Sequence, residues 1–282
     1  MEIPIEDINK LKETIRSVST YDFSDYSEKS YVRRIEKILA DNKLSIDQLI
    51  EKMVRDSSFL EIVIKEITVN TTELFRDPKI WQIIKHNIMN RFADEPVIKI
   101  WHAGCSTGQE VYSMLMLLNE LDLLDKAVVY GTDLNEDVLK IASKGKYKYR
   151  DISEYIQNFD VVLCEDPYNF ENKSEVLYSK YLDINKLKDS VQVKDFLLEK
   201  PVFLKHDLVT EGNIFNTKFH IIMCRNVLIY FNHNLQNRLF EFFYENLYDN
   251  GCLIIGRHEG ILGNIATRFK KKETIYFKKN EY

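Results

Sequence analysis

A short loop between Ala103 and Glu110 has the residue types of a ligand-binding turn. It reads AGCSTGQE, follows the apolar run VIKIW and precedes the apolar helical stretch VYSMLMLLNEL. Backbone N–H groups at the start of such a helix point toward polar groups of a ligand, and Gly104 and Gly108 let a ligand approach the backbone closely. The alternative interpretation is an ordinary turn between a strand and a helix, which has the same residue types. Because the loop is neither GxGxxG nor GK[ST], it argues against a dinucleotide dehydrogenase or a phosphate-loop ATPase.

An acidic residue adds a second element to this candidate site. Asp133 ends the apolar segment AVVYGTD, and an acid at the tip of the second strand of an α/β unit can accept both hydroxyls of a ribose. Capping of the next helix is the alternative role, but Asn135 already fits that role. The loop and Asp133 together predict an adenosine-type ligand.

Two later apolar segments also end in polar residues. His206-Asp207-Leu208 follows PVFLK, and Cys224-Arg225-Asn226-Val227 follows FHIIM. Ligands of open parallel sheets bind at the carboxyl ends of the strands, so these residues would face the same crevice as Asp133. Arg and Asn also commonly satisfy loop carbonyls, and both roles are open at each position taken alone. The convergence of four strand ends favours a ligand site.

A mostly parallel sheet must bring these strand ends together, and the sequence predicts one after residue 96. Strand, loop and helix alternate through VIKIW, VYSMLMLLNEL, AVVYGTDL and a helix containing Val138 and Ile141. The alternation resumes with PVFLKHDL, FHIIMCRNV and a helix over residues 234–248, which is the order of an α/β fold. Asp249-Asn250-Gly251 predicts a turn, and the segments CLIIG and TIYFKK then predict a closing hairpin. Between these two runs, residues of about 147–200 have weak periodicity and predict an insertion with short antiparallel strands.

The N-terminal third is predicted to be helical. All nine glycines lie between Gly104 and Gly263, and glycine supplies the positive-φ turns of hairpins and phosphate loops. Apolar residues recur at helical steps over 5–18, 31–39 and 59–67. We therefore expect an all-α domain over residues 1–75 and an α/β domain over residues 76–282.

Two local signals mark where helices begin. Ser45 and Gln48 form the pattern of a capping box, which predicts the start of a further helix in the N-terminal domain. Asp77 and Pro78 predict a capping aspartate followed by proline at the first helical position, at the start of the helix that contains Trp81.

Composition excludes several classes of protein. A net charge of -5 and a pI near 5.8 leave no overall positive charge for binding nucleic acid or an anionic membrane. The four cysteines are far apart, without a CxxC pair or histidines at metal spacing, so we expect reduced thiols and no metal site. The acidic start MEIPIEDINK does not resemble a signal peptide, and no window has transmembrane length. The expected location is the cytoplasm.

Five strings in this order make a specific resemblance: NTTELFRDP, AGCSTGQEVYS, GTDLN, HDL and CRNVLIYF. They resemble the chemotaxis receptor methyltransferases of the CheR family, and the likeness spans nearly the whole chain because a helical N-terminal domain is part of the family plan. The resemblance implies a Rossmann-like methyltransferase domain with a small antiparallel β insertion. It further implies methyl transfer from S-adenosylmethionine to glutamate side chains of methyl-accepting chemoreceptors, with S-adenosylhomocysteine as the product.

The resemblance also implies roles for individual residues. Glu110 matches the acid at the methionine end of the cofactor, and Asp133 matches the ribose acid. Arg76 and Tyr230 match the residues closest to the transferred methyl group and are the expected catalytic residues. The expected cofactor contacts are Asn70, Thr72, Arg76, Gly104, Glu110, Asp133, Asp207, Leu208, Arg225 and Asn226.

The expected partner is the glutamate-rich helical region of transmembrane chemoreceptors. Arg33, Arg34 and Lys37 cluster in one predicted helix; such a run is often only a solvated face, but the family meets its substrate with a basic N-terminal helix, which favours docking here. Binding of a receptor tether peptide by the insertion does not carry over to this glycine-free, charged stretch. The segment GRHEG departs from the family order, although Glu259 keeps its place.

Two other functions fit parts of the sequence. A methyltransferase acting on a small molecule would not need the basic helix, and a non-catalytic cofactor-binding signalling module would share the same cofactor residues. The presence of Arg76, Glu110, Asp133, Asn226 and Tyr230 argues against a decayed site.

Overall fold

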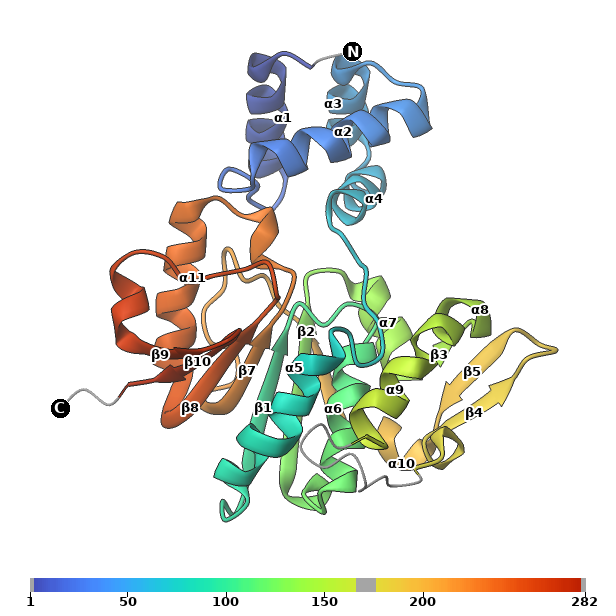
Figure 1. Cartoon of the computed structure of the whole chain (residues 1–282). Coiled ribbons are helices and arrows are strands. Elements are labelled where there is room, and N and C mark those ends of the chain that lie inside the picture. The colour runs from blue at the N-terminus through green and yellow to red at the C-terminus, as the bar shows by residue number, and fades with distance from the viewer. Residues whose placement is uncertain (1–2, 166–175, 280–282) are drawn as a thin grey trace.

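A seven-stranded sheet forms the centre of the C-terminal part of the chain (Figure 1), in a computed structural model that describes residues 3–165 and 176–279. The strand order is β6-β2-β1-β7-β8-β10-β9. Neighbours are parallel from β6 through β8, whereas β10 runs antiparallel to both β8 and β9. The mostly parallel sheet and the antiparallel pairing of CLIIG with TIYFKK are confirmed, but these two strands do not form a hairpin, because the hairpin joins β10 to β9, which was not predicted. In sheet order the strands are β6 (Pro201–Lys205), β2 (Ala127–Asp133), β1 (Ile98–Ala103), β7 (Phe219–Cys224), β8 (Leu247–Ile255), β10 (Ile275–Lys278) and β9 (Phe269–Lys272).

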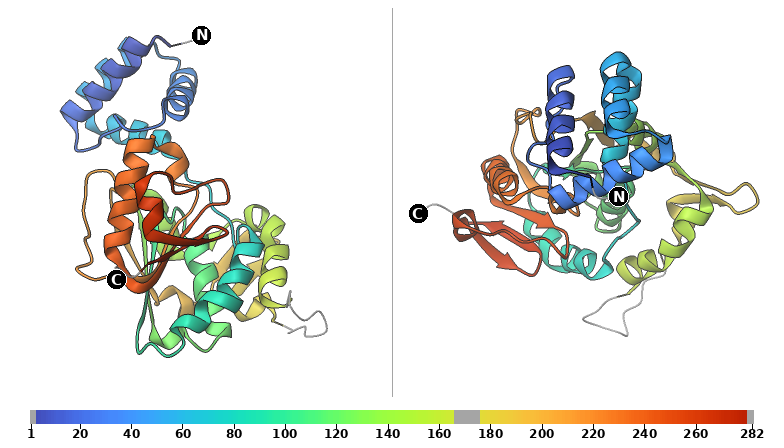
Figure 2. Two further views of the ribbon diagram at one scale, coloured as in Figure 1. Left: turned by 60° about the vertical axis from the view of Figure 1, so that its left-hand side comes forward. Right: turned by 90° about the horizontal axis from the view of Figure 1, so that it is seen from above.

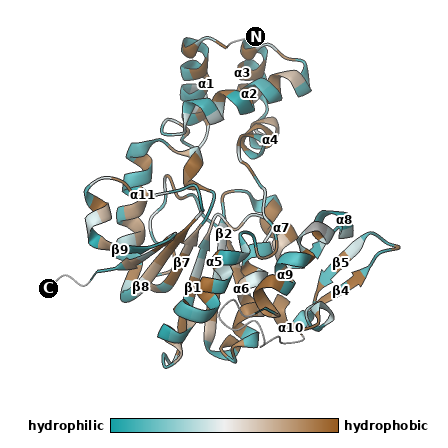
Figure 3. Cartoon of the chain, in the orientation of Figure 1, coloured by the Kyte–Doolittle hydropathy of each residue, from teal (hydrophilic) through white to brown (hydrophobic). Residues whose placement is uncertain are grey.

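Helices cover both faces of this sheet (Figure 2). Strand residues such as Ile100 and Ile221 pack against α5 (Pro78–Ile83), its continuation η1 (Ile84–Ile88) and η2 (Met89–Phe92), α6 (Gln109–Glu120) and α7 (Glu136–Lys144). Alternate strand residues such as Trp101 and Ile222 point the other way, toward α11 (His233–Asn246) and η7 (Asn264–Arg268). In Figure 3 the central strands are largely hydrophobic, whereas the helices alternate between hydrophobic and hydrophilic residues. Short 3₁₀ turns lie at η3 (Leu124–Lys126) and η6 (Leu228–Tyr230).

The insertion contains the predicted antiparallel strands and several helices that were not predicted. Its sheet has the order β3-β5-β4, formed by β3 (Lys146–Tyr147), β5 (Ser190–Val193) and β4 (Leu182–Asn185). The helical elements are α8 (Tyr149–Ile152), η4 (Ser153–Tyr155), α9 (Ile156–Leu163), η5 (Tyr178–Lys180) and α10 (Asp195–Leu198). Residues 166–175 of the predicted insertion lie outside the described residues.

Four helices with their own apolar core precede the sheet. They are α1 (Ile5–Val18), α2 (Glu28–Asn42), α3 (Ile46–Arg55) and α4 (Ser57–Ile67). The predicted capping box is present, because Ser45 accepts a hydrogen bond from the Gln48 N–H and the Gln48 side chain accepts one from the Ser45 N–H. In Figure 1 these helices lie above the edge of the sheet where the parallel strands end.

Two local predictions are wrong. Asp77 does not cap α5, because its carboxylate instead accepts a hydrogen bond from Arg225 at 2.7 Å. The stretch 249–251 is not a turn between helix and strand, because β8 already begins at Leu247 and includes it. A register shift between β7 and β8 shows that these residues form an irregularity within the strand.

A buried arginine ties three segments together at the carboxyl edge of the sheet. Arg225 directly follows β7, and its side chain is only 1% exposed. It donates hydrogen bonds to Glu110 of α6 at 3.0 Å, to Asp77 at 2.7 Å and to the Arg76 carbonyl at 2.9 Å. Glu110 is also hydrogen-bonded to Nδ1 of His102 at 2.9 Å. One guanidinium group therefore fixes the end of β7, the start of α6 and the segment leading into α5.

This cluster sets the ionisation of Glu110. Burial alone raises the pKa of Glu110, but the hydrogen bond from His102 and the charge of Arg225 outweigh burial and hold this pKa below its usual value. A carboxyl group with a lowered folded-state pKa stabilises the fold above its unfolded-state pKa. That stabilisation is lost as the pH falls through the folded-state value.

We expect Glu110→Gln to lower the free energy of unfolding at pH 7 by about 3 kcal/mol, because it removes one of the two carboxylates that pair with a buried arginine. The difference from the wild type should begin to shrink as the pH falls below the unfolded-state pKa of about 4.3. It should be lost only when the pH is below the lowered pKa that Glu110 has in the fold. Urea unfolding followed by circular dichroism at several pH values measures both effects.

The matched control is Glu51→Gln, which breaks an exposed pair with Arg55 on α3. An exposed pair contributes about 0.5 kcal/mol or less, so this variant should unfold almost like the wild type at every pH. A Glu110→Gln difference that already disappears above about pH 4.5 contradicts the assigned ionisation, because a carboxyl group with a lowered pKa stays charged in the fold to below that value.

Candidate functional site

A narrow cavity lies where the carboxyl edge of the sheet meets the N-terminal helices. Its walls come from the loops after β1, β2, β6 and β7, from the segment that follows α4, and from the loop between α1 and α2. The structure therefore brings the four predicted strand ends to one place. The lining residues include Asn70, Gly104, Asp133, Asp207, Leu208, Arg225, Asn226 and Tyr230.

The loop after β1 is held in a conformation that depends on glycine. Gly104 has a φ of +80°, and a Cβ atom at this position would lie 2.5 Å from Cγ2 of Val227. The N–H groups of Gly104 and Cys105 both donate to the Thr132 carbonyl at 2.8 Å. The loop is thus bonded to the end of β2, and its backbone lies directly against the cavity.

Asp133 organises the same loop from its position at the end of β2. Its two carboxylate oxygens accept hydrogen bonds from the N–H of Ser106 at 2.8 Å and the N–H of Asn135 at 3.0 Å. Asn135 caps α7 through a bond from the Asp137 N–H, so the cap expected there is confirmed. Burial raises the pKa of Asp133, and the two N–H donors partly oppose this shift. A carboxylate oxygen can accept more than one hydrogen bond, which leaves Asp133 able to receive ligand hydroxyls.

Four polar atoms around the cavity are buried without a hydrogen-bond partner. They are Oγ of Ser106, Nδ1 of His206, Nε of Arg225 and Oδ1 of Asn226. Leaving a buried polar group unpaired costs about 1–3 kcal/mol, so such atoms are uncommon in folded proteins. Four of them at one cavity indicate a polar ligand that pairs with both donors and acceptors. A nucleoside that carries an amino acid group fits this set together with Asp133.

Glu259 holds the loop that carries Asn226 and Tyr230. Its carboxylate accepts hydrogen bonds from the N–H of Asn226 at 2.9 Å, of Gly256 at 2.6 Å and of Ile229 at 3.2 Å. A Cβ atom on Gly256 would lie 2.7 Å from Oε2 of Glu259. Glycine is therefore needed for this close approach, and GRHEG keeps both residues despite its changed order.

The remaining predicted residues lie around the cavity or on α2. Thr72, Arg76 and Glu110 are not among the residues that line the cavity. Glu110 and the carbonyl of Arg76 instead accept hydrogen bonds from Arg225, which does line the cavity. The carboxylate of Asp207, although at the cavity, accepts hydrogen bonds from the N–H of Val209 and the hydroxyl of Thr210 and so stabilises its own turn.

The basic residues of α2 differ in their exposure. Arg33 and Lys37 are exposed, whereas Arg34 is half-buried. Burial raises the pKa of Tyr230, and the positive charges of Arg34 and Arg76 oppose this shift, so both guanidinium groups lie near its hydroxyl.

Several lining residues were not predicted as site residues. Ser106, His206, Tyr26 and Phe231 all line the cavity. Ser106 belongs to the loop after β1, and His206 belongs to the strand end His206-Asp207-Leu208 that is predicted to face this crevice, but neither is given a role of its own by the sequence. Tyr26 and Phe231 come from segments far apart in the sequence, and no local pattern links them.

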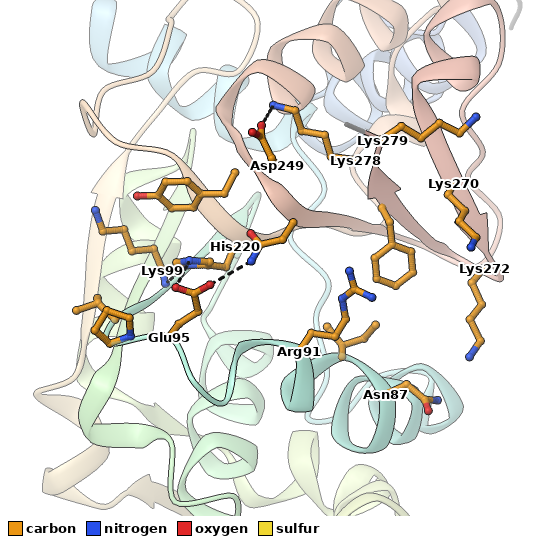
Figure 4. Close-up of a pocket in the computed structure, with 16 residues that line it drawn as sticks. Asn87, Arg91, Glu95, Lys99, His220, Asp249, Lys270, Lys272, Lys278 and Lys279 are labelled. Atoms are coloured by element: carbon orange, nitrogen blue, oxygen red, sulfur yellow. Dashed lines mark hydrogen bonds and ion pairs between the residues drawn. The ribbon is translucent and has the colours of Figure 1, made fainter. Parts of the chain in front are cut away.

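A second, larger hollow of about 1370 Å³ lies at the opposite edge of the sheet (Figure 4). Glu95 hydrogen-bonds Asn250 at 3.1 Å and lies 3.8 Å from His220, while Lys99 donates to Thr217 at 2.6 Å. Lysines on the edge strand β9 are a common protection against strand pairing between molecules. None of the predicted site residues, all of them within the described ranges, lines this hollow. Its basic residues are Arg91, Lys99, Lys270, Lys272, Lys278 and Lys279.

Three other features bear on the expected chemistry and location. Over residues 3–165 and 176–279, no group of three or more His, Cys, Asp or Glu side chains is arranged to hold a metal ion. In the same ranges no helix combines the length and apolar character that crossing a membrane requires. The four cysteines are free thiols.

Comparison with known proteins gives the family. Residues 70–277 match the model of the CheR methyltransferase S-adenosylmethionine-binding domain. A Pseudomonas putida protein named Cher3 is 33% identical over 256 residues, which cover 90% of this chain and 89% of that protein. The chemotaxis protein methyltransferase of Listeria monocytogenes is 28% identical over 86% of this chain and 85% of its own length, and that of Borreliella burgdorferi is 31% identical over 82% and 77%. The chain therefore belongs to the CheR family and is an S-adenosylmethionine-dependent methyltransferase.

Proposed function

We propose that this methyltransferase forms methyl esters on glutamate side chains in the helical cytoplasmic region of chemoreceptors. The observation that carries the proposal is that the positive charges of Arg34 and Arg76 act on Tyr230, which lines the cavity, and oppose the rise in its pKa caused by burial. A substrate carboxylate is attracted to these two guanidinium groups, whereas a neutral nucleophile gains little from them. The names of the Listeria and Borreliella relatives support a role in chemotaxis.

The residues around the cavity fit the cofactor. We assign Asp133 to the ribose hydroxyls, because it ends β2 beside the glycine loop. We assign Asp207 and Leu208, at the end of the neighbouring strand β6, to the adenine side. Gly104, Asn70 and the Glu110–Arg225 pair then lie toward the methionine end. When bound, S-adenosylmethionine supplies a methyl group on a positively charged sulfur, which a carboxylate oxygen accepts with release of S-adenosylhomocysteine.

Catalysis then depends on positioning rather than on proton transfer. A glutamate side chain is already ionised near neutral pH, so no general base is needed. Arg76 is assigned to orient the substrate carboxylate, and the Tyr230 hydroxyl, which stays protonated because its pKa is raised, can donate a hydrogen bond to it. Opposite charges disappear as the bond forms, so a cavity that excludes water favours the reaction.

Docking is assigned to the N-terminal domain, which we place at residues 1–75. Arg33 and Lys37 are four residues apart and so lie on one face of α2, where both are exposed. A glutamate-rich receptor helix complements this basic face.

The catalytic domain then comprises residues 76–282.

The direct test is methyl transfer from labelled S-adenosylmethionine to purified receptor cytoplasmic domains. We expect label in the receptor that is released as methanol by mild base, because a carboxyl ester is hydrolysed under conditions that leave N-methyl groups intact. A receptor fragment whose methylatable glutamates are replaced by alanine is the control. Label that survives the base treatment is not a carboxyl ester and contradicts the proposal.

We expect Arg76→Ala and Tyr230→Phe each to lower kcat by about 10- to 100-fold, because each removes a group that positions the substrate carboxylate. The fold should persist, since Arg76 contacts Arg225 through its backbone carbonyl, which alanine retains. Steady-state kinetics together with thermal unfolding separates the two effects. Arg55→Ala and Tyr178→Phe, at exposed positions away from the cavity, are matched controls. Wild-type turnover in either test variant removes the role assigned to that residue.

Reversing the charge of the docking face should weaken receptor binding without altering chemistry. We expect the double variant Arg33→Glu, Lys37→Glu to raise the KM for the receptor by about tenfold at low salt, with kcat retained and with a weaker dependence of KM on salt. Kinetics at several ionic strengths measures this. The matched control reverses Lys10 on α1, whose partner is Asp47 of α3. An unchanged KM at low salt refutes docking on this face.

A further inference from the structure

The loop between α1 and α2 is hydrogen-bonded to the loop that carries Tyr230. Tyr26 pairs with Phe231 in an isolated antiparallel bridge, and the N–H of Ser27 donates to the Tyr230 carbonyl at 2.8 Å. The N–H of Asn232 donates to the Asp25 carbonyl at 2.8 Å, and its side-chain amide donates to the Asp25 carboxylate at 2.9 Å. The N-terminal helices are thus joined to the catalytic loop through main-chain bonds.

The side chain of Tyr26 lies at the centre of this joint. Its half-buried ring makes edge contacts with Phe23 at 4.6 Å and with Phe231 at 5.0 Å between ring centroids. It packs against the apolar core of the N-terminal helices and also against the core beneath α11. The same ring lines the cofactor cavity, beside Leu208 and Val209.

The surroundings of Tyr26 suit an adenine ring. Leu208, Val209 and Phe231 provide apolar and aromatic surface next to it, and flat aromatic rings pack well against one another. The hydroxyl lies near the carboxylates of Asp133 and Asp207, and burial together with these negative charges raises the pKa of Tyr26, which therefore remains neutral. A neutral aromatic ring can cover the base without repelling either acid.

We propose that Tyr26 forms the adenine-side wall of the cofactor cavity and couples cofactor binding to the position of α2. The inference rests on the proposed placement of the ribose at Asp133. It adds to that placement a contact made by the N-terminal domain, on a residue that none of the family strings contains.

The coupling follows from the short path between the two sites. α2 begins at Glu28, two residues after Tyr26, and carries the docking residues Arg33 and Lys37. A bound cofactor that packs on Tyr26 stabilises the joined arrangement of the two domains. Because binding free energies are reciprocal, a receptor docked on α2 in turn raises the affinity for the cofactor.

The test measures binding of S-adenosylhomocysteine by calorimetry, so it does not depend on turnover. We expect Tyr26→Ala to raise the Kd by about tenfold, and Tyr26→Phe to stay within about threefold of the wild type because the ring is retained. Tyr21→Ala is the matched control, because this tyrosine of the same loop bonds Glu61 and Lys205 and does not line the cavity. It should lower stability while leaving the Kd unchanged.

A second measurement tests the coupling itself. We expect S-adenosylhomocysteine to slow hydrogen exchange of the Ser27 amide in the wild type, and Tyr26→Ala to remove this protection even when the ligand is saturating. Thermal unfolding shows whether each variant is folded. Protection that persists in saturated Tyr26→Ala contradicts the coupling.

The controls separate the possible failures. If Asp133→Asn weakens binding but Tyr26→Ala does not, Tyr26 is not part of the cofactor wall and the inference is overturned. If both bind like the wild type, the placement of the ribose is wrong, and the inference falls with it. Both outcomes are independent of whether receptors receive base-labile methyl groups, so failure of the substrate proposal is recognised separately.

Discussion

The buried positive charge of Arg225 is the constraint on which the rest of the site depends. A side chain that is 1% exposed and carries a guanidinium group has to be matched by acceptors. Here they come from two segments that are distant in sequence: Glu110 at the start of α6, and Asp77 with the Arg76 carbonyl before α5. Displacement of any one of these acceptors removes a hydrogen bond from a buried charge. The cluster therefore fixes the segment that carries Arg76 against the start of α6 before any ligand arrives. Such preorganisation suits a reaction in which the enzyme mainly aligns two reactants.

The cavity lies at the boundary between two apolar cores, and each side contributes a different part. The sheet supplies strand ends that are hydrogen-bonded to each other through the main chain. For example, the Thr132 carbonyl accepts hydrogen bonds from the loop after β1. The helical side supplies the ring of Tyr26 and the charge of Arg34. Tyr230 is supported from both directions, because its carbonyl is bonded to Ser27 and its loop is bonded to Glu259. Substrate docking and cofactor binding thus meet at one short loop.

Much of this arrangement could be predicted from local sequence, and the part that could not depends on distant partners. Apolar runs ending in Asp133 or Asp207 identified the strand ends, because a parallel sheet exposes polar residues where its strands stop. Asp77 was misassigned as a helix cap because its real partner, Arg225, is 148 residues away. β9 was missed because FKKK has no alternation of apolar and polar residues. Tyr26 gave no signal, since its importance comes from the pairing with Phe231 rather than from its neighbours.

Glu259 makes the order of the catalytic loop depend on a residue that is synthesised after that loop. Glu259 follows β8, late in the chain, and its carboxylate accepts hydrogen bonds from the N–H groups of Asn226 and Ile229. The loop held in this way contains Asn226, a proposed cofactor residue, and Tyr230, a proposed substrate residue. During synthesis the helical domain and five strands of the sheet, β1, β2, β6, β7 and β8, emerge before this carboxylate exists. A nascent or truncated chain that ends before Glu259 already contains the proposed contacts with both reactants but lacks the acceptor that shapes their loop. Such a chain can fold its helical domain and much of its sheet and still lack the hydrogen bonds that order the loop containing Asn226 and Tyr230.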